Sequence, residues 1–376
     1  MLRFLPAIAH SAERPQAGRC GDLQRGAADL LRAGRAASHS EPVPELDHDQ
    51  VLQRVARCWP GATLSGLHRL PGGVSSLTFS SVLRRPDRPD TPVVVKVAPP
   101  GLAPVRNRDV LRQARILRLL DEDGSVPVPK VLAEDDGSPP LFVMTLVPGE
   151  SYEPLLDAAA QPPSPGVVTA RALAAARALA RLQNVPAGRS GERAVPVREE
   201  LDRWARLLDT VDPKIAPRHE KLYRELSGRA PAPVAPCLSH GDFRLANMLF
   251  TGERLTAVID WEIWSVGDPR VDLAWLLMHT DPPHRFHAPR AEADVKAGSG
   301  MPSRAELLEA YQGIRPGAVA DLPWFLAYSH YKTVSTLAVL IKRNRRLAEP
   351  EPHLETAAES LPDAVERGRR ILAQSK

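Results

Sequence analysis

The chain has 376 residues, a length that suggests two domains or lobes and a tail. Its hydrophobic fraction of 43% and charged fraction of 25% are ordinary for a soluble globular enzyme, and a net charge of +4 does not point to a nucleic-acid partner. Three widely spaced cysteines exclude a disulfide scaffold and a zinc-finger array and favour a reducing compartment. Because no run of 18 apolar residues occurs, we expect no membrane span and a cytoplasmic location. The oligomeric state stays open.

Residues 1–45 differ in composition from the rest of the chain. Gly, Ala, Arg and Ser dominate there, with no sustained hydrophobic period. The opening MLRFLPAIAH has no clear cleavage site, which argues against a signal peptide, and three acidic residues at 13, 22 and 29 argue against an Arg-rich transit peptide. We interpret residues 1–45 as a disordered tail or as an extension from a mis-called start codon.

Residues 46–148 have the pattern of a small α+β lobe. A short helix is predicted at 51–59, and strand-like runs follow at 63–70, 74–84 and 93–98. The last two runs are separated by RRPDRPDTP, a polar turn of the hairpin type. The spacing of apolar residues predicts an amphipathic helix over 109–120, and residues 141–147 predict a further strand. We therefore expect a small antiparallel-sheet N-lobe with one helix among its strands.

Residues 149–376 have a mostly helical pattern. Helices are predicted at 168–182, 198–208, 217–227, 272–278, 304–311, 324–343 and 353–372. A short β-rich interlude at 237–260 interrupts them. The expected fold class is α+β, with a small sheet lobe followed by a larger, mainly helical C-lobe.

One polar run stands out within the β-rich interlude. Residues 239–247 are SHGDFRLAN, and the chain continues through MLF, a TGER turn and TAVID, which ends at Asp260. An Asp followed five residues later by an Asn, with a hairpin that delivers a second Asp, is typical of phosphoryl transfer. The first carboxylate accepts the proton of an attacking hydroxyl, while the Asn and the second Asp hold Mg²⁺ on the phosphates of ATP. An ordinary polar turn between buried strands is the alternative.

This segment resembles the aminoglycoside phosphotransferase and choline kinase group of the protein-kinase-like fold, which carries H-G-D-x-x-x-x-N and then an Asp on the next strand. HGDFRLANMLF and VIDWEIWSVGDPRVDLAW are more similar still to one branch, the phosphotransferase-like domain found alone in bacteria or fused to some acyl-CoA dehydrogenases. GMPSRAELLEAY and DLPWFLAYSHYKTVSTLAVLIKRNRR also resemble that branch. The resemblance covers about residues 50–346. It implies a two-lobed protein-kinase-like fold, with a nucleotide-binding N-lobe (46–148) and a catalytic and acceptor-binding C-lobe (149–376).

Carried over by position, the resemblance implies Asp242 as the base and Asn247 and Asp260 as metal ligands. Arg244 stands where many protein kinases have a Lys near the γ-phosphate. A guanidinium there can stabilise charge on the transferring group, and a surface ion pair is the alternative.

Neighbouring polar side chains are expected to have structural roles. We expect the imidazole of His240 to brace the loop rather than to act in catalysis. Asp268 and Asp272, in GDPRVD, are expected to cap and orient the following helix. Glu262, two residues after Asp260, is expected to be structural rather than an indirect contact of the second metal ion.

The N-lobe is expected to supply the other half of an ATP site. Alternation in VVVKVA puts Lys96 on one face of its strand, where a buried Lys among β-branched residues needs an anion such as phosphate. An edge-strand Lys facing water is the alternative. The stretch PGGVSS occupies the place of the fold's phosphate-covering loop, with four candidate residues, Gly72, Gly73, Ser75 and Ser76. Residues 142–147 resemble the inter-lobe strand whose backbone contacts adenine, with Val143 and Thr145 as candidates.

The helix after the Lys96 strand departs from the family pattern. A Glu usually pairs with the Lys from this helix, and RQARILRLL places Gln113 at that position. A Gln accepts a hydrogen bond but adds no charge. Asp109, one turn earlier on the same face, is the candidate substitute.

Two functions therefore stay open. The first is an ATP- and Mg²⁺-dependent kinase that acts on a hydroxyl of a small molecule. The second, motivated by Gln113, is a low-activity or pseudokinase module that binds a nucleotide or an acyl-CoA.

Charge on the late helices bears on the acceptor. In the resembling enzymes these helices wall the acceptor pocket, and residues 322–348 contain no Asp or Glu. The same span and the loop before it are rich in cations, namely Lys332, Lys342, Arg343, Arg345 and Arg346, with His284, Arg285, His287 and Arg290 before them. We therefore expect an anionic or CoA-linked acceptor rather than a polycationic aminoglycoside or another antibiotic, with a solvated helix end as the alternative explanation of the charges.

Overall fold

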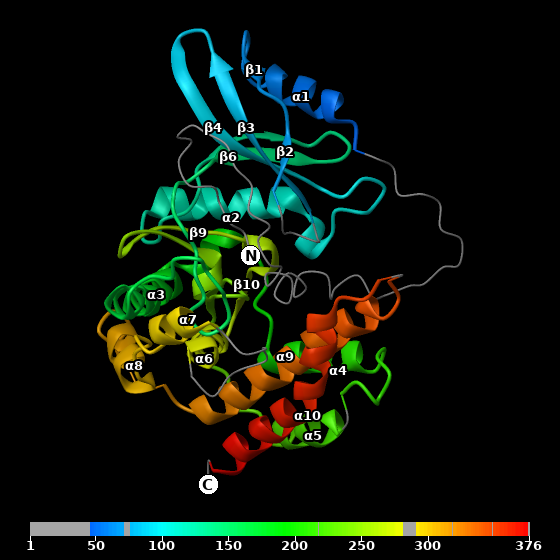
Figure 1. Cartoon of the computed structure of the whole chain (residues 1–376), viewed down its shortest axis with the longest axis vertical. Coiled ribbons are helices and arrows are strands. Elements are labelled where there is room, and N and C mark those ends of the chain that lie inside the picture. Colours follow the sequence, from blue (N-terminus) through cyan, green and yellow to red (C-terminus); the bar gives the residue numbers. More distant parts are fainter. Residues whose placement is uncertain are drawn as a thin grey trace.

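The computed structural model describes residues 46–70, 76–216, 218–280, 291–317, 319–347 and 349–374. A β-sheet with two helices forms one part of the molecule, and helices with two small two-stranded sheets form the other (Figure 1). The sheet is antiparallel throughout, with the order β1-β3-β4-β6-β5 and with β2 paired to β3. Its elements are α1 (His48–Arg57), β1 (Thr63–Leu64), β2 (His68–Arg69), β3 (Leu77–Arg85), β4 (Arg88–Val97), α2 (Val110–Asp123), β5 (Val131–Asp135) and β6 (Leu141–Thr145).

The two faces of this sheet have different partners. Val93, Val95 and Val97 of β4 point to one face, where they form a core with Val51 and Val55 of α1. The alternate residues point to the other face, as a strand with a period of two requires. On that face lie α2 and the core of the helical part, so α2 lies between the sheet and the helices (Figure 1). The predicted two-lobed architecture is confirmed.

An arginine of α2 links the two lobes. The guanidinium of Arg112 donates a hydrogen bond to Trp264 O at 2.9 Å and lies 4.1 Å from the centroid of the Trp264 ring. Because Trp264 follows the predicted metal ligand Asp260 by only four residues, this contact ties the N-lobe helix to the site.

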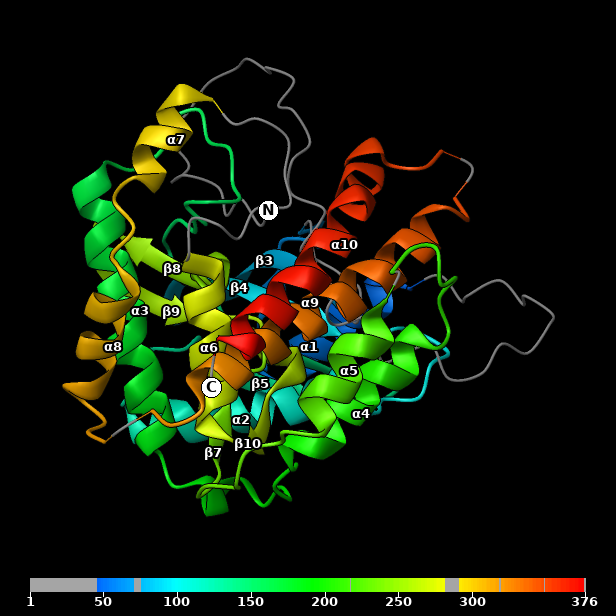
Figure 2. The same cartoon turned by 90° about the horizontal axis from the view of Figure 1, so that it is seen from below.

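The helical part contains the predicted helices. Its elements are α3 (Pro165–Asn184), α4 (Val197–Leu208), α5 (His219–Ser227), α6 (Pro269–Thr280), α7 (Glu292–Gly298), α8 (Arg304–Gln312), α9 (Leu322–Asn344) and α10 (Pro352–Ala373). Figure 2 shows α10 running alongside α9. None of the helices in these described ranges is long and apolar enough to cross a lipid bilayer.

The sequence pattern does not predict β5 or α7, nor the three-residue strand β10 (Ser265–Gly267), which lies beyond the predicted interlude at 237–260. Strand β5 is only five residues long and ends in the polar pair Glu134–Asp135, so it has no clear alternation. Helix α7 spans only seven residues, and its last three include Lys296 and Gly298. None of these segments is long enough to show a hydrophobic period, which is the signal on which sequence-based assignment depends.

Two small two-stranded sheets carry the polar motif. Strand β7 (Cys237–Ser239) pairs with β10 (Ser265–Gly267), and β8 (Met248–Thr251) pairs with β9 (Arg254–Val258). The loop between β7 and β8 and the segment after β9 therefore emerge side by side, because the Ile259 N–H donates to Asn247 O at 2.9 Å.

Candidate active site

The turn that follows β7 requires glycine. Gly241 has a φ of +85°, and a Cβ at this position would lie 2.6 Å from Ile263 O. An L-residue would be strained by both the backbone conformation and the clash. The glycine of the His-Gly-Asp sequence therefore allows the turn to pack against the segment after Asp260.

His240 and Asp272 hold this turn. The Asp242 N–H donates to His240 Nδ1 at 3.2 Å, and His240 Nε2 lies 2.9 Å from Ile259 O, so the two contacts fit one tautomer. The carboxylate of Asp272 accepts the His240 N–H at 2.6 Å and the Gly241 N–H at 3.1 Å. The predicted bracing role of His240 agrees with this geometry. The prediction for Asp272 is wrong, because its carboxylate holds the turn rather than capping α6, whereas Asp268 does accept the Arg270 N–H at 2.9 Å.

The carboxylate of Asp242 lies among several donors. Oδ1 accepts Arg244 Nε at 3.0 Å and Trp275 Nε1 at 2.8 Å, and Oδ2 accepts Asn247 Nδ2 at 2.8 Å. Burial alone would raise the pKa of Asp242, but nearby cations, Arg244 first, hold that pKa well below its usual range. The group is therefore charged and fixed in orientation.

Asn247 and Asp260 occupy adjacent positions beside this carboxylate. The amide nitrogen of Asn247 donates to Asp242 O and Oδ2, both at 2.8 Å, which directs the amide oxygen away from Asp242. Asp260 follows β9 in the left-handed conformation, with φ +66° and ψ +55°, and its side chain is 34% exposed. A non-glycine residue in this conformation is strained and occurs where a side chain is aimed at a site.

Lys96 reaches this site from the sheet. Its buried ammonium lies 3.5 Å from Asp260 Oδ1 and 3.4 Å from Glu262 Oε1. Burial would lower the pKa of Lys96, but the two carboxylates, Glu262 first, outweigh it and raise that pKa. The edge-strand alternative is therefore wrong. Ser76 Oγ also donates to Glu262 Oε1 at 3.4 Å, which places the last of the loop candidates beside the lysine.

The predicted partner of Lys96 is corrected by these contacts. Asp109 is the N-cap of α2, where its side chain accepts the Arg112 N–H at 2.9 Å, and it also lies 3.6 Å from Arg115. Gln113 is buried and donates to Asn107 O at 3.2 Å. Glu262, expected to be structural, supplies the carboxylate instead. A sequence signal existed, since Glu262 follows a predicted metal ligand by two residues.

The remaining nucleotide candidates differ in placement. Gly72, Gly73 and Ser75 lie outside the described residues. Val143 lies between β4 and β5 with its side chain in the sheet core, and the Thr145 N–H donates to Lys130 O at 2.9 Å. The main-chain groups of Val143 and Thr145 are therefore already used in pairing within the N-lobe.

A buried carboxyl group next to the loop was missed. Glu153 Oε2 accepts the Ala246 N–H at 3.1 Å. Burial, opposed by Arg244, raises the pKa of Glu153 to about 8. Glu153 Oε1 and Arg244 Nη1 are both buried without a hydrogen-bond partner among the described residues. Arg244 itself is buried against Asp242, so the surface ion-pair alternative is wrong.

The cations of α9 are largely engaged within the protein. Lys332 is buried and donates to Gly241 O, while Lys342 donates to Thr210 O. Arg345 pairs with Glu355 of α10 at 2.7 Å. The expectation of a basic wall facing an acceptor is therefore corrected at three of the five cations of residues 322–348. The cationic loop residues 284, 285, 287 and 290 lie outside the described residues.

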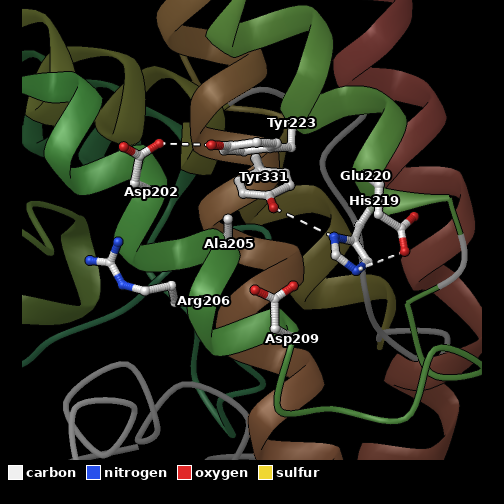
Figure 3. Close-up of a pocket in the computed structure, with 8 residues that line it drawn as sticks. All are labelled: Asp202, Ala205, Arg206, Asp209, His219, Glu220, Tyr223 and Tyr331. Atoms are coloured by element: carbon white, nitrogen blue, oxygen red, sulfur yellow. Dashed lines mark hydrogen bonds and ion pairs between the residues drawn. The ribbon is translucent and has the colours of Figure 1, made fainter.

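A cavity of about 320 Å³ lies between α4, α5 and α9, apart from the predicted site residues (Figure 3). Its lining has three carboxylates and one arginine, so it is acidic. The lining residues are Asp202, Ala205, Arg206, Asp209, His219, Glu220, Tyr223 and Tyr331. This part of α9 thus borders an acidic surface rather than a basic one.

Known proteins match most of this chain. A model of the phosphotransferase enzyme family matches residues 66–308, a range that contains Lys96 and the whole motif around Asp242. Acyl-CoA dehydrogenase family member 10 of Mus musculus is 27% identical over 274 residues, which cover 68% of this chain and 25% of the relative. Acyl-CoA dehydrogenase family member 11 of Homo sapiens is 28% identical over 257 residues, which cover 64% and 32%. The chain thus spans about a quarter to a third of the length of these relatives.

Solved phosphotransferase structures share the fold. A Ralstonia eutropha protein provisionally described as an aminoglycoside phosphotransferase gives a TM-score of 0.68 at 21% identity and covers 88% of this chain and 100% of that chain. The aminoglycoside phosphotransferase APH(4)-Ia, in a ternary complex with AMP-PNP and hygromycin B, gives 0.58 at 16% identity and covers 87% and 98%. The predicted fold is confirmed by these likenesses. With more than half of its length matched by the family model, the chain belongs to the phosphotransferase enzyme family.

Proposed function

We propose that this chain transfers the γ-phosphoryl group of ATP to a hydroxyl of a small molecule, with Mg²⁺. One observation carries the proposal. The Asp242 carboxylate accepts from the Asn247 amide, and the main-chain carbonyl of Asn247 accepts from Ile259, the residue before Asp260. The Asp260 carboxylate in turn lies beside the ammonium of Lys96, so these groups gather where the two lobes meet. This is the set of groups that phosphoryl transfer by a kinase needs.

Asp242 is the proposed proton acceptor. The oxygen of the acceptor hydroxyl forms a bond to the γ-phosphorus, the bond from phosphorus to the β,γ-bridging oxygen breaks, and ADP leaves. The hydroxyl proton passes to a carboxylate oxygen of Asp242. Because the pKa of Asp242 is low, this carboxylate mainly orients the hydroxyl and takes the proton late, which suits a loose transition state.

Asn247 and Asp260 are the proposed metal ligands. Both offer hard oxygen atoms, which Mg²⁺ prefers, and two protein ligands suffice where phosphate and water complete the shell. The orientation of the Asn247 amide and the partly exposed Asp260 carboxylate fit that role. The described residues contain no group of three or more His, Cys, Asp or Glu side chains arranged for a metal ion. When bound, Mg²⁺ supplies positive charge that neutralises the phosphate oxygens.

Lys96 is the proposed phosphate contact in the N-lobe. Its partners Glu262 and Asp260 keep the ammonium charged and hold it beside the segment that follows β9. Arg244 is a second proposed cation, because its Nη1 has donor capacity beside the Asp242 carboxylate. A guanidinium there favours negative charge on the transferring group.

For the acceptor we propose a hydroxylated, CoA-linked metabolite. The support is the similarity to acyl-CoA dehydrogenase family members 10 and 11 over a quarter to a third of their lengths. The charge of α9 no longer adds to this argument, since Lys332 and Lys342 bind main-chain carbonyls.

The low-activity alternative loses its original motivation. It rested on Gln113, but Lys96 has two carboxylate partners without that residue. A nucleotide- or acyl-CoA-binding module without turnover is therefore an outcome of the test rather than a second proposal.

A screen for ATP-dependent phosphorylation tests the function. The purified chain is incubated with Mg²⁺ and ATP against hydroxyacyl-CoAs, amino alcohols, aminoglycosides and macrolides, and ADP release and phosphorylated product are measured. Asp242→Asn is the control for contaminating kinases. Acceptor-dependent ADP release that the control lacks supports the proposal, and the acceptor class with the highest kcat/KM identifies the substrate. Tight Mg²⁺–ATP binding with no product from any class would contradict it.

A further inference from the structure

Lys332 of α9 has an environment that is unusual for a charged side chain. It is only 3% exposed, and no ion pair joins it to a carboxylate in the described part of the chain. Its ammonium donates instead to the carbonyl oxygen of Gly241 in the catalytic turn. Since burying an ammonium without an anion is costly, the position needs a reason other than packing.

Two indole rings complete the surroundings of this ammonium. Nζ lies 4.0 Å from the ring centroid of Trp275 in α6 and 5.8 Å from that of Trp204 in α4. The negative faces of these rings offset part of the lost hydration. The cage thus keeps a cation on the catalytic turn without a direct ion pair in the described part of the chain, although the charges of Asp242 and Asp272 also attract it.

The same Trp275 ring connects the cation to the reacting carboxylate. Trp275 Nε1 donates to Asp242 Oδ1 at 2.8 Å. A cation over the ring face polarises the indole and makes its N–H a stronger donor, because linked hydrogen-bonding groups polarise one another. Lys332 therefore acts on Asp242 through two contacts, the Gly241 carbonyl and the Trp275 indole, and its charge also attracts the carboxylate directly.

These contacts complete the support of the turn. Asp272 of α6 holds the N–H groups of His240 and Gly241, whereas Lys332 holds the carbonyl of Gly241. The N–H and the carbonyl of Gly241, whose φ is +85°, are thereby each bonded to a side chain from a different helix. Because Asp242 is the next residue, a change in the backbone conformation of Gly241 would displace the Asp242 carboxylate.

We propose that Lys332 is a positioning residue for phosphoryl transfer, which sets the orientation of the Asp242 carboxylate through Gly241 and Trp275. This inference rests on the proposed function. It places one determinant of the turnover rate in a late helix, far along the chain from the motif. Lys332 does not contact the reacting groups in this arrangement.

Kinetics of three variants of Lys332 and one control test the proposal. Lys332→Met keeps the length of the side chain but removes its charge and its hydrogen-bond donors. Lys332→Arg keeps the charge and the donors. Lys332→Gln keeps a donor for Gly241 O without a cation over Trp275, and replaces Lys332→Met if that variant does not fold. The matched control is Lys342→Met, since Lys342 also lies in α9 and also donates to a main-chain carbonyl.

We expect Lys332→Met to lower kcat about 100-fold, the size of effect known for a misplaced catalytic group, with the KM for ATP changed less than about twofold. Lys332→Arg should recover most of the loss, and Lys342→Met should match the unsubstituted protein. A folded Lys332→Met variant with unchanged kcat would overturn the proposal. So would equal losses in Lys332→Met and Lys332→Arg, because they would indicate a packing role.

A second measurement needs no acceptor and no turnover. In ¹H–¹⁵N spectra the indole N–H signal of Trp275 is assigned with Trp275→Phe. We expect it to move in Asp242→Asn, which changes its acceptor, and in Lys332→Met or Lys332→Gln, but not in Lys342→Met. An unmoved signal in the folded Lys332 variants refutes the proposal even if the chain proves to be a kinase. A moved signal with no turnover in the unsubstituted protein contradicts the proposed function instead.

Discussion

The sheet lobe and the helical lobe each bury one lysine next to the site, and the two lysines differ in their partners. Lys96 of β4 lies between the carboxylates of Asp260 and Glu262, which raise its pKa against the opposing effect of burial. Lys332 of α9 has a carbonyl and indole faces, and burial lowers its pKa. Both side chains are nearly inaccessible, so exposure does not distinguish them.

The difference indicates what each lysine does. A lysine paired with carboxylates can exchange one anion for another, so Lys96 is suited to a phosphate that arrives and leaves. A lysine whose direct contacts are a carbonyl and aromatic rings has no bonded anion to exchange, so Lys332 is suited to a fixed position. Changes on the Lys96 side should therefore affect nucleotide binding, and changes on the Lys332 side should affect the rate.

The largest effect on turnover is expected at Asp242, the carboxylate that Lys332 is proposed to position. Asp242→Asn keeps the shape of the side chain and removes the proton acceptor, so kcat should fall by about 10²–10⁴ while ATP binding persists. Turnover and nucleotide affinity are measured on the same preparation. If the variant keeps more than about a tenth of kcat, Asp242 is not the base.

The sequence predicts the motif residues and Lys96 better than it predicts the contacts that the two lysines make. Asp242, Asn247 and Asp260 lie within 19 residues of one another in a specific motif, and the strand of Lys96 alternates clearly. The contact from Lys96 to Glu262 joins residues 166 positions apart, and the contact from Lys332 to Gly241 spans 91. Such pairs depend on how the lobes and helices pack, which the hydrophobic period of a single segment does not encode. The sequence therefore favours an acceptor wall for the cations of residues 322–348, several of which the packing instead uses within the protein.

A second prediction concerns the Lys96 side alone. Glu262→Gln removes one of the two negative charges that hold Lys96 and weakens the contact with Ser76. We expect the KM for ATP to rise on the order of tenfold with a smaller change in kcat, since a charge-assisted hydrogen bond contributes about 1.5–3 kcal/mol. Steady-state kinetics with ATP as the varied substrate measure both. An effect on kcat alone would contradict the division between the two lysines.

Glu153 offers a contrast with the two charged lysines. It is a buried carboxyl group beside the catalytic loop, and burial favours its protonated, neutral form. Its ordinary pKa is 4.5, and burial raises the pKa in the folded protein to about 8. Between these values the folded state binds the extra proton, so this group lowers the free energy of unfolding as pH rises toward 8 and no further above it. Glu153→Gln keeps an acceptor for the Ala246 N–H and cannot ionise.

The melting temperatures of Glu153→Gln and the unsubstituted protein should thus be similar near pH 4.5 and diverge as pH rises to about 8, with the variant more stable. Glu349→Gln, the same change at an exposed position, serves as the control. A constant difference at every pH would show that Glu153 does not titrate in this range.

The smallest effect is expected at Asp109, which the sequence favoured as the partner of Lys96. In the structure its carboxylate caps α2 through the Arg112 N–H at 2.9 Å, while Lys96 has its two carboxylates elsewhere. Asp109→Ala should therefore lower the free energy of unfolding by about 0.5–2 kcal/mol, the usual loss for a helix N-cap, and leave the KM for ATP unchanged. Asp109→Asn, which can still cap, should recover the stability. A rise in the KM for ATP in both variants would mean that the carboxylate charge at 109 does reach the nucleotide, and that the anion partners of Lys96 extend beyond Asp260 and Glu262.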